Sequence, residues 1–396
     1  MTLDFKKMAC SFFLGILLQL SITAQPPVSG HQKRMQELFD SSGIVGMGAV
    51  LIVDKKVVWS GGWGWMNLEE KIPFTEHTIM NVASIAKSFT GACIMKAVED
   101  GLLSLDTDIN HYLPFKITNP YQPDKIITLR HLLSHTSGIT DRRSYYANTY
   151  IDNKDPDTDL ETTIKNYFIK GAKDYDTSNF LNKAPGTFRD YSNLGFALAG
   201  YILEKRVSMS LPEYSKRNIF DKLGMKQSAW YLRDTDMKKH TRLYDRENGP
   251  LKQIPLYTCP TYPDGGLRTS PTELAKFFIA MLNDGVYEGT RILSKHSVEQ
   301  MIAKQHTPDN CPENVNLAKA NSGLGWAYKD NATKMGHAGT DPGVKTEMLC
   351  DLNKEIGVIL FTNTGLPIRE LIKYHVGIFD ELMAMGKTYQ QSTRKK

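Results

Sequence analysis

Two apolar runs, separated by a short polar segment, stand near the start of the chain. Residues 47–53 (Met-Gly-Ala-Val-Leu-Ile-Val) and 57–60 (Val-Val-Trp-Ser) flank Asp54, Lys55 and Lys56. Short runs rich in β-branched and aromatic residues on either side of turn residues predict a β-hairpin.

A long apolar segment with a helical pattern follows, from Ser84 to near Gly101. Strand patterns are then sparse until about residue 255. The clearest patterns in between are helical, at 127–133, 194–205 and 211–222. We therefore expect residues 102–254 to form a mostly helical insert.

Strand patterns return in the last third of the chain. Residues 262–268 are interpreted as a strand and a turn, and Ser270-Pro271-Thr272-Glu273 matches a capping box that opens a helix. An apolar helix is expected over 368–385. Four short segments are typical of consecutive antiparallel strands: 323–327, 333–336, 345–350 and 356–362.

This order of elements predicts an α+β fold, in which an antiparallel sheet flanked by helices carries an inserted, mostly helical domain. Both ends of the chain contribute to the sheet. A binding cleft is expected where the two domains meet. The expected limits are 25–40 for a linker and the start of the first helix, 41–101 and 255–386 for the sheet domain, 102–254 for the helical insert, and 387–396 for a polar tail.

The composition is that of a globular protein. Of the 396 residues, 41% are hydrophobic and 23% are charged, which is enough apolar material for a core and argues against disorder. The net charge of +5 is small for this length, and aromatic residues are not interleaved with runs of Lys and Arg. We therefore expect no nucleic-acid partner.

The first residues are typical of a secretory signal peptide. Lys6 and Lys7 precede an apolar run from Met8 to Leu20, and small residues follow it. The run is shorter than the roughly 20 residues that a membrane-spanning helix needs. We predict a signal peptide over 1–24 and a secreted or periplasmic protein. The alternative is an N-terminal membrane anchor, the one case in which we expect contact with a membrane.

The cysteines do not form a disulfide scaffold. Cys10 would leave with the signal peptide, and Cys93 lies in the helical segment after Ser84, where a buried free thiol is expected. Cys259 and Cys311 lie in loop-like sequence and could pair in an oxidising compartment. Cys and His residues show no metal-ligand spacing, so we expect neither a metal nor another cofactor.

Ser84 and Lys87 are three residues apart at the start of the helical segment, so they share one face of the helix. A serine hydroxyl becomes a good nucleophile when a base takes its proton, and a desolvated lysine can be that base. The alternative is a helix N-cap next to a solvated lysine. Ser392 and Lys395 in the polar tail have the same spacing, with no similar surroundings.

A second proton carrier is available at Tyr191. Tyr191 and Asn193 follow Pro185-Gly186 on a loop that leads into a helix, so both side chains can point into a cleft. Tyr146 and Asn148 have the same spacing, but no Pro-Gly turn precedes them and no apolar helix follows. We expect Tyr146 to be a chance match. The alternative for Tyr191 is a half-buried structural tyrosine.

A glycine-rich segment, Gly336-His337-Ala338-Gly339-Thr340, supplies the third group. Its glycines let backbone approach a ligand closely. An edge strand here can aim backbone N–H groups at a developing oxyanion. The alternative for His337 is a surface histidine beside a turn.

Taken together, three ordered motifs resemble the signatures of the serine β-lactamase and penicillin-binding-protein superfamily, in particular its class C-like branch of esterases and D-amino-acid peptidases. Supporting stretches are 127–138, 265–267 and 323–326. The similarity runs from about 40 to 385 and implies a β-lactamase/transpeptidase-like fold. The motifs are Ser84-Ile85-Ala86-Lys87, Tyr191-Ser192-Asn193 and His337-Ala338-Gly339.

The resemblance implies acyl transfer, with Ser84 as the nucleophile and Lys87 as the base or part of its relay. Tyr191 would carry protons to the leaving group. A lysine base near neutral pH needs a lowered pKa, and burial pushes it that way. The substrate-binding residues would be Asn193, His337, Gly339 and Thr340, and the N–H groups of Ser84 and Thr340 would form the oxyanion hole.

One departure from the family pattern bears on the substrate. Penicillin-recognising members usually have Lys-Thr-Gly in the third motif, and this chain has His337-Ala338-Gly339. We therefore expect a secreted serine hydrolase that acts on a small-molecule or peptide substrate with an ester or amide bond. The first alternative is a true β-lactamase or D-Ala-D-Ala carboxypeptidase. An alternative of another class is a non-catalytic binding protein that keeps the fold.

Overall fold

The computed structural model describes residues 29–394 of the chain. The predicted signal peptide at 1–24, together with Cys10, lies outside the described residues.

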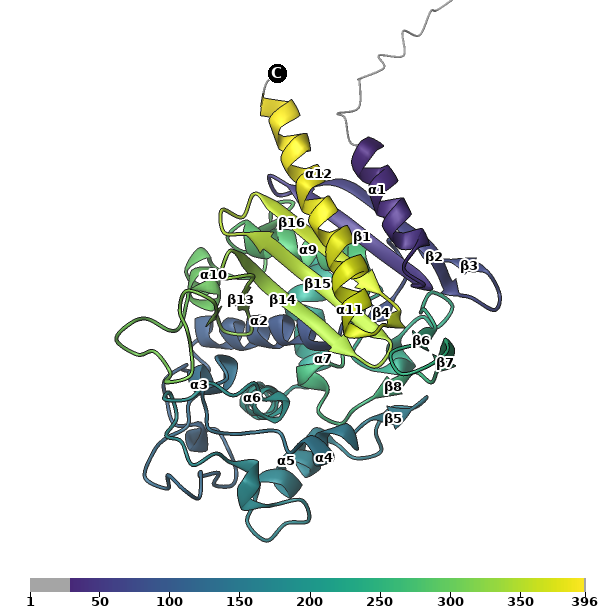
Figure 1. Ribbon diagram of the computed structural model, residues 1–396. Helices are drawn as coiled ribbons and strands as arrows, with labels where there is room; N and C mark the ends of the chain where they lie inside the picture. The colour runs from purple at the N-terminus through teal and green to yellow at the C-terminus, as the bar shows by residue number, and fades with distance from the viewer. Residues whose placement is uncertain (1–28, 395–396) are drawn as a thin grey trace, which may run out of the picture.

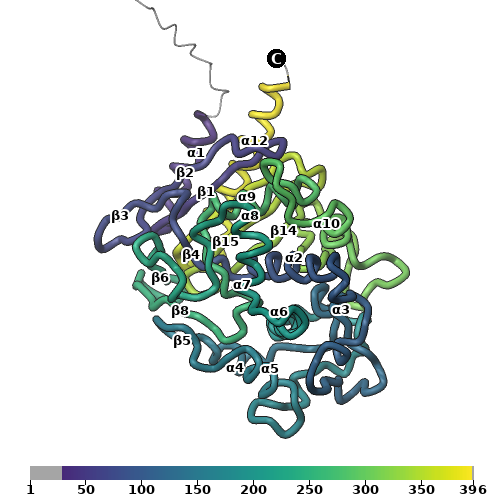
Figure 2. The backbone as a smooth tube through the Cα atoms, turned by 180° about the vertical axis from the view of Figure 1, so that it is seen from behind, coloured from purple at the N-terminus to yellow at the C-terminus, as the bar shows by residue number. Residues whose placement is uncertain are grey.

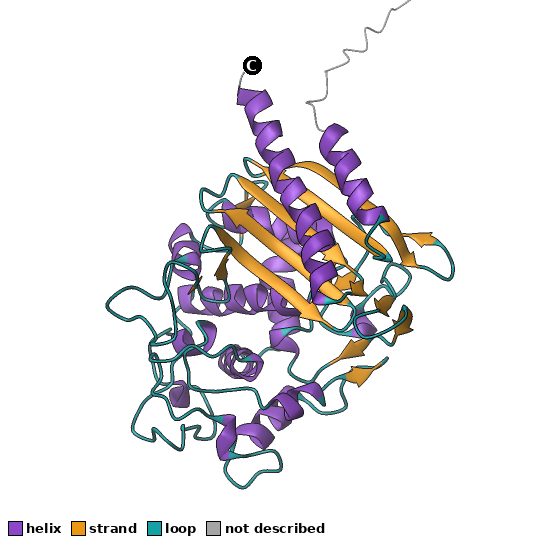
Figure 3. Cartoon of the chain, viewed as in Figure 1, coloured by secondary structure: helices purple, strands orange, loops and turns teal. Residues whose placement is uncertain are grey.

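An antiparallel sheet built from both ends of the chain organises the fold (Figures 1 and 3). The α+β architecture expected from the sequence is confirmed. Strand β1 pairs with its neighbour β2 on one side and with β16 from the far end of the chain on the other. In spatial order the strands are β12 (Asn321–Ser322), β13 (Ala327–Lys329), β14 (Lys334–Asp341), β15 (Val344–Asp351), β16 (Ile356–Thr362), β1 (Gly46–Val53), β2 (Lys56–Asn67) and β3 (Ile72–Pro73).

The predicted hairpin is strands β1 and β2. Its turn residues Asp54 and Lys55 have φ values of 48° and 65°. Two consecutive residues in the left-handed region are typical of a type I′ turn, whose twist matches that of the flanking strands.

Side chains of β1 alternate between two apolar layers, as the period of a strand requires. Met47 and Leu51 belong to the cluster that also contains residues of α1 (Ser29–Asp40) and α12 (Gly377–Arg394). Val50 and Ile52 face the larger core, which contains α2 (Ala86–Glu99) and α9 (Pro271–Leu282). The sheet is therefore buried on both faces. Figure 1 shows α1 and α12 crossing one of these faces side by side.

Between α2 and strand β8 most of the regular elements are helices, and long loops connect them (Figure 2). Buried α6 packs against α2, α3 and α5 and so joins this region to the sheet domain. The α-helices here are α3 (Leu129–Leu133), α4 (Arg143–Ala147), α5 (Leu160–Phe168), α6 (Asn193–Val207), α7 (Leu211–Ser215) and α8 (Asp221–Leu223), with a π-helical turn at Lys216–Phe220.

Several small strand pairs lie outside the main sheet. Strand β17 (Thr364–Gly365) continues from β16 and pairs with β6 (Leu243–Asp245), which lies at one end of the site described below. The other short strands are β4 (Met80–Asn81) with β9 (Arg268–Thr269), β5 (Ile151–Asp152) with β8 (Tyr257–Thr258), β7 (Lys252–Ile254) beside β6, and β10 (Val286–Tyr287) with β11 (Thr290–Arg291).

The strand predicted at 323–327 is wrong. Residues 323–326 form the turn between β12 and β13, and Ala327 alone lies in a strand. Gly325 has φ 71°, and a Cβ there would lie 2.6 Å from the carbonyl oxygen of Lys87. The glycine is needed for this close approach of backbone to α2, and its left-handed conformation is incompatible with a continuous strand.

Two further predictions differ in detail. Residues 262–268 contain a 3₁₀ turn (Tyr262–Asp264) and only the beginning of a strand. The C-terminal helix starts as α11 (Ile368–Glu370), passes through a π-helical segment (Leu371–Val376) and continues as α12 into the segment expected to be a polar tail. The remaining helix is α10 (Lys295–Ile302).

The four described cysteines, Cys93, Cys259, Cys311 and Cys350, are free thiols. The suggested pairing of Cys259 with Cys311 is therefore wrong. The expectation for Cys93 is confirmed, because its side chain is buried in the core. Over residues 29–394, no helix combines the length and the apolar character needed to cross a membrane.

Candidate active site

Ser84 lies in a 3₁₀ turn (Ala83–Ile85) that leads directly into α2. Ala83 has φ 48°, a strained value for a residue with a Cβ, and its N–H donates to Asn81 Oδ1 at 2.8 Å. The first N–H groups of a helix have no acceptor within the helix, and that of Ser84 is in this position. The turn therefore presents both the hydroxyl and a backbone donor.

Lys87 lies one helical turn further on and is fully buried. Its Nζ donates to Ser84 Oγ at 3.2 Å and to Asn193 Oδ1 at 2.6 Å. A third bond, of 2.7 Å, goes to the carbonyl oxygen of Asp264. A lysine ammonium has three donors and no acceptor, so these three acceptors match the protonated form.

The charges around Lys87 lead to the same conclusion. Burial by itself lowers the pKa of Lys87, but attraction to the phenolate form of Tyr191 and to the carboxylate of Asp264 outweighs it, so the pKa lies above its ordinary value. The downward effect of burial that the sequence suggested is therefore present, but the anionic groups that the fold brings close to Lys87 outweigh it.

Tyr191 reaches the nucleophile directly. Its hydroxyl oxygen is 2.8 Å from Ser84 Oγ, so a proton can pass between the two oxygens. The ammonium of Lys87 lies 5.0 Å from the centroid of the tyrosine ring. The ring is 38% exposed on one side and packs on the other against His135, with ring centroids 4.2 Å apart. Tyr191 is thus held beside the nucleophile and is open to solvent.

Asp141 positions the loop that carries Tyr191 and Asn193. Its carboxylate accepts bonds from Ser192 Oγ at 2.9 Å and from the N–H groups of Asn193 and Leu194 at 2.7 and 3.0 Å. These N–H groups begin α6, where a negative charge is favourable. Burial nevertheless raises the pKa of Asp141. Sequence reasoning missed this residue, whose only signal was its place just after the family-like stretch 127–138.

His337, in the third motif, does not contact the cavity as a substrate-binding residue would. His337 is 5% exposed, is absent from the pocket lining, and has its Nδ1 2.8 Å from the carbonyl oxygen of Ala338. Burial, together with the positive charge of Lys87, lowers the pKa of His337 to about 3, so the ring is neutral. The alternative of a surface histidine is therefore wrong, because the ring is buried.

Gly339 also lies behind the pocket wall. A Cβ there would lie 2.4 Å from the carbonyl oxygen of Val82 and 2.9 Å from the Cβ of Ala83. The glycine therefore lets β14 lie against the turn that carries Ser84. Of the predicted residues on β14, only Thr340 lines the pocket. Strand β13 pairs with β14 only as far as Gly336, so the edge of β14 near Thr340 has no strand beside it on that side.

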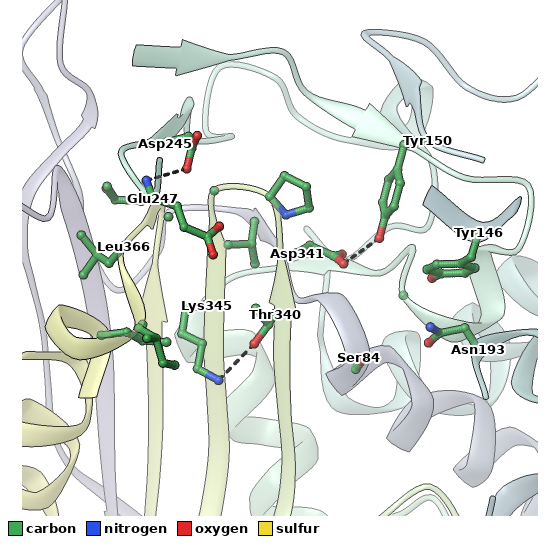
Figure 4. A pocket seen from close by; sticks show the side chains of 18 of the residues that line it. Ser84, Tyr146, Tyr150, Asn193, Asp245, Glu247, Thr340, Asp341, Lys345 and Leu366 are labelled. Atoms are coloured by element: carbon green, nitrogen blue, oxygen red, sulfur yellow. Dashed lines mark hydrogen bonds between the residues drawn. The ribbon is translucent and has the colours of Figure 1, made fainter. Parts of the chain in front are cut away.

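A cavity of ≈ 560 Å³ opens over these residues. In the view of Figure 4, Ser84, Asn193 and Tyr146 are at one end, Asp245, Glu247 and Leu366 are at the other, and Thr340 and Asp341 lie between them. Ser84, Tyr191, Asn193 and Thr340 share this cavity, so the structure brings four of the seven predicted site residues to one surface. Lys87 is not part of the cavity lining, but it contacts Ser84 from the next turn of α2. His337 and Gly339 lie on β14 behind the cavity wall.

Two tyrosine–carboxylate pairs line the cavity between its middle and its Ser84 end. Tyr146 donates to Asp264 Oδ1 and Tyr150 donates to Asp341 Oδ1, both at 2.8 Å. Burial raises the pKa of Asp264 to about 7 and that of Asp341 to about 6. Tyr146, expected to be a chance match, therefore belongs to the pocket. The carboxylates were also missed, although Asp264 directly precedes the family-like 265–267 and Asp341 directly follows Thr340.

Across residues 29–394, His, Cys, Asp and Glu side chains form no group of three or more that could hold a metal ion. What the site offers is a nucleophile, a proton partner at hydrogen-bond distance, a buried ammonium and free backbone N–H groups at a helix start. These parts suit acyl transfer through a covalent intermediate.

Comparisons with known proteins agree with this arrangement. The family model described as Beta-lactamase matches residues 31–380. Protein flp of Staphylococcus aureus (strain MRSA252) is 22% identical over 323 residues, which cover 81% of this chain and 60% of that protein. The chain thus spans well under two thirds of the length of this curated relative.

Solved structures with the same fold include a penicillin-binding protein homologue. The octameric homologue from Pyrococcus abyssi superposes with a TM-score of 0.68 at 26% identity, covering 89% of this chain and 77% of that one. The D-amino acid amidase of Ochrobactrum anthropi SV3 superposes with a TM-score of 0.69 at 20% identity. The match covers 92% of this chain and 100% of the amidase chain. At that identity the second likeness establishes the fold alone.

Proposed function

The chain belongs to the beta-lactamase family, and on this premise we propose that it is a serine hydrolase that forms an acyl-enzyme through Ser84. Its substrate is a small molecule or peptide with an ester or amide bond. The observation that carries the proposal is the bonded group of Ser84, Lys87 and Tyr191, in which the nucleophile contacts both a proton acceptor and a fixed positive charge.

Acylation starts at the 2.8 Å contact between Tyr191 and Ser84. Tyr191 in its phenolate form takes the proton of Ser84 Oγ as that oxygen attacks the substrate carbonyl. Lys87 keeps its charge and stabilises the phenolate through space. The resulting phenol then gives its proton to the leaving group. Lys87 thereby positions and polarises the site, and Tyr191 moves the proton.

The developing oxyanion is stabilised by the backbone N–H groups of Ser84 and Thr340. Preorganised donors of this kind are worth about 3 to 4 kcal/mol each in acyl transfer. Deacylation repeats the proton transfers with water in place of Ser84, because Tyr191 is open to solvent on one side. The product acid is then released and the hydroxyl of Ser84 is restored.

True β-lactamase or D-Ala-D-Ala carboxypeptidase activity is the second candidate, and family membership favours it. The observation against this activity is that the third motif has His337 where penicillin-recognising members usually have a lysine. His337 is neutral and buried, and Ala338 offers no hydroxyl, so neither residue supplies the charge that would hold a β-lactam carboxylate. We expect slow turnover of β-lactams.

Secretion is part of the same proposal. The basic pair Lys6 and Lys7 and the apolar run after it support a signal peptide at 1–24 and a secreted or periplasmic enzyme. N-terminal sequencing of the mature protein tests this. A sequence that begins near Gln25 supports cleavage, and one that begins at Met1 supports the membrane anchor.

The test of catalysis is covalent labelling with a fluorescent fluorophosphonate, followed by a substrate panel. Wild type should label and Ser84→Ala should not. Ser392→Ala is the matched control, because Ser392 also has a lysine three residues later and should label like wild type. Equal labelling of wild type and Ser84→Ala would exclude Ser84 as the nucleophile. Absence of labelling and turnover in wild type would favour a non-catalytic binding protein.

The panel compares nitrocefin, a D-alanyl peptide and a short-chain nitrophenyl ester. We expect the ester or the peptide to be hydrolysed at least about tenfold faster than nitrocefin, since a missing charged contact costs about that factor. Fast nitrocefin turnover would reverse the order of the two candidates.

A further inference from the structure

Beyond the nucleophile, the cavity wall is acidic and aromatic. Four carboxylates line the cavity, at Asp245, Glu247, Asp264 and Asp341, against one cation, Lys345. The charge of Lys345 is already engaged, because its Nζ lies 3.2 Å from Glu347 Oε1. The charge of Lys87 is likewise directed to its three acceptors.

Asp264 is the most informative of these groups. Its side chain is 1% exposed, yet its Oδ2 has no hydrogen-bond partner among the described residues. Buried carboxylate oxygens are normally satisfied, because an unpaired one costs about 1 to 3 kcal/mol or more. Asp264 also lines the cavity, so this incompletely satisfied carboxylate lies beside any ligand that enters it.

Asp341 lies on the same side of the cavity and is half-buried. One of its oxygens accepts from Tyr150 at 2.8 Å, and the other has only a long contact of 3.4 Å with Asn81 Nδ2. Asp341 therefore keeps acceptor capacity that faces the same space as Asp264. Both residues also line a small cleft behind this wall, together with Tyr146 and Tyr150.

The two tyrosines add a surface that suits a cation. The rings of Tyr146 and Tyr150 meet edge to face, with centroids 5.9 Å apart and planes at 80°. Aromatic faces attract a positive charge within about 6 Å of the ring centre, and do so more strongly where water is excluded. Two rings at right angles beside two carboxylates form a corner, and we call Tyr146, Tyr150, Asp264 and Asp341 the acidic corner.

We propose that the acidic corner binds a primary ammonium group of the substrate, beside the bond that Ser84 attacks. The inference rests on the proposed function and narrows its substrate class to amino-acid amides, amino-acid esters or peptides with a free amino terminus. N-acylated analogues lack the charge and bind more weakly. The raised pKa values of the two carboxyl groups agree with an incomplete site, since an ammonium would favour their charged forms.

The test uses two ligands that differ only in the amino group. Phenylalanine amide, in each enantiomer, and 3-phenylpropanamide are titrated by calorimetry into the Ser84→Ala variant at pH 7. The amine should bind about tenfold or more tightly in at least one enantiomer, the factor expected for a charged hydrogen bond. Equal affinities for all three amides, or no measurable binding of the amines, would overturn the proposal.

Two further variants in the Ser84→Ala background locate the effect. Asp341→Asn keeps an acceptor for Tyr150 and removes the charge, and it should reduce the ratio of amine to neutral-amide affinity to about threefold or less. Glu247→Gln removes a charge at the opposite end of the same cavity and should leave that ratio unchanged. Equal reductions in the two variants would mean that all the carboxylates of the cavity attract the amine alike. That result would overturn the assignment to the acidic corner.

The calorimetry needs no turnover, so it separates this proposal from the proposed function. Binding of the amine without labelling of wild-type Ser84 would support the acidic corner and contradict the hydrolase. Labelling and ester hydrolysis without amine preference would support the hydrolase and contradict the acidic corner.

Discussion

The helix-borne and the strand-borne sides of the cavity are organised differently. On the helix-borne side, Ser84, Lys87, Tyr191 and Asn193 form one connected set of hydrogen bonds. On the strand-borne side, only Thr340 of the third motif faces the cavity, while His337 and Gly339 lie behind β14. The same side of the cavity also presents Asp341, a carboxylate with acceptor capacity to spare.

This difference indicates that the two sides of the cavity have different roles. A set of side chains whose donors and acceptors already match is preorganised for one reaction and changes little when a substrate binds. The strand-borne side, by contrast, keeps acceptor capacity at Asp341, which a substrate donor would fill. We therefore expect substitutions on the helix-borne side to change kcat, and substitutions on the strand-borne side to change stability and substrate choice.

Lys87→Met should have the largest effect. The reacting groups act as a unit, so kcat/KM should fall by about 10⁴-fold or more. Stability should also fall, by about 1 to 3 kcal/mol, because Asn193 Oδ1 and the carbonyl oxygen of Asp264 lose their buried donor. Ester turnover and thermal unfolding measure the two effects. Lys96→Met, which removes a half-buried lysine paired with Asp100 on the same helix, is the control. Retention of a tenth of the activity in Lys87→Met would contradict the central role of the ammonium.

Tyr191→Phe should come next. The change removes the oxygen 2.8 Å from Ser84 and keeps the ring that packs on His135. Loss of a general acid–base group lowers kcat by about 10²- to 10⁴-fold. Steady-state kinetics on the best ester measures it. Tyr201→Phe removes another buried tyrosine hydroxyl, in the middle of α6, and should keep wild-type kinetics. A Tyr191→Phe variant within a few-fold of wild type would shift the proton-transfer role to Lys87.

Asp141→Ala should have a smaller effect on kcat and a clear one on stability. It leaves Ser192 Oγ and the N–H groups of Asn193 and Leu194 without their acceptor. We expect a loss of about 2 to 3 kcal/mol in the free energy of unfolding and roughly a tenfold loss of kcat, because the Tyr191 loop loosens. Urea unfolding and kinetics test this. Asp141→Asn, which keeps one acceptor oxygen, should recover part of both.

His337→Asn should have the smallest effect on turnover and a pH-dependent effect on stability. The folded-state pKa of about 3 lies below the usual 6.5, so the stability contributed by the neutral ring is present above pH 6.5 and is lost as pH falls towards 3. Between pH 7 and pH 5 wild type should lose about 2 kcal/mol more than the variant, at about 1.4 kcal/mol per pH unit. Denaturant unfolding at both pH values measures it. Identical losses would mean that His337 is already charged or exposed.

Much of the fold could be predicted from local patterns in the sequence. The hairpin at β1 and β2 and the capped starts of α3 and α9 follow from periodicity and capping residues, which act within a few residues of chain. The strand expected at 323–327 failed because Gly325 takes a left-handed conformation to approach the backbone of Lys87. That contact joins segments far apart in the chain and leaves no trace in the local pattern.

The sequence alone predicts which side chains carry the chemistry. The spacing of Ser84 and Lys87 on one helix, and of Tyr191 and Asn193 before another, is local geometry that a pattern can specify. The way in which these groups act depends on contacts between segments that are distant in the chain. The charge of Lys87 depends on Tyr191 and Asp264, which packing brings within a few ångströms of it, and the burial of His337 depends on the layers around β14. A pKa reflects neighbours in space, and a sequence specifies only neighbours along the chain.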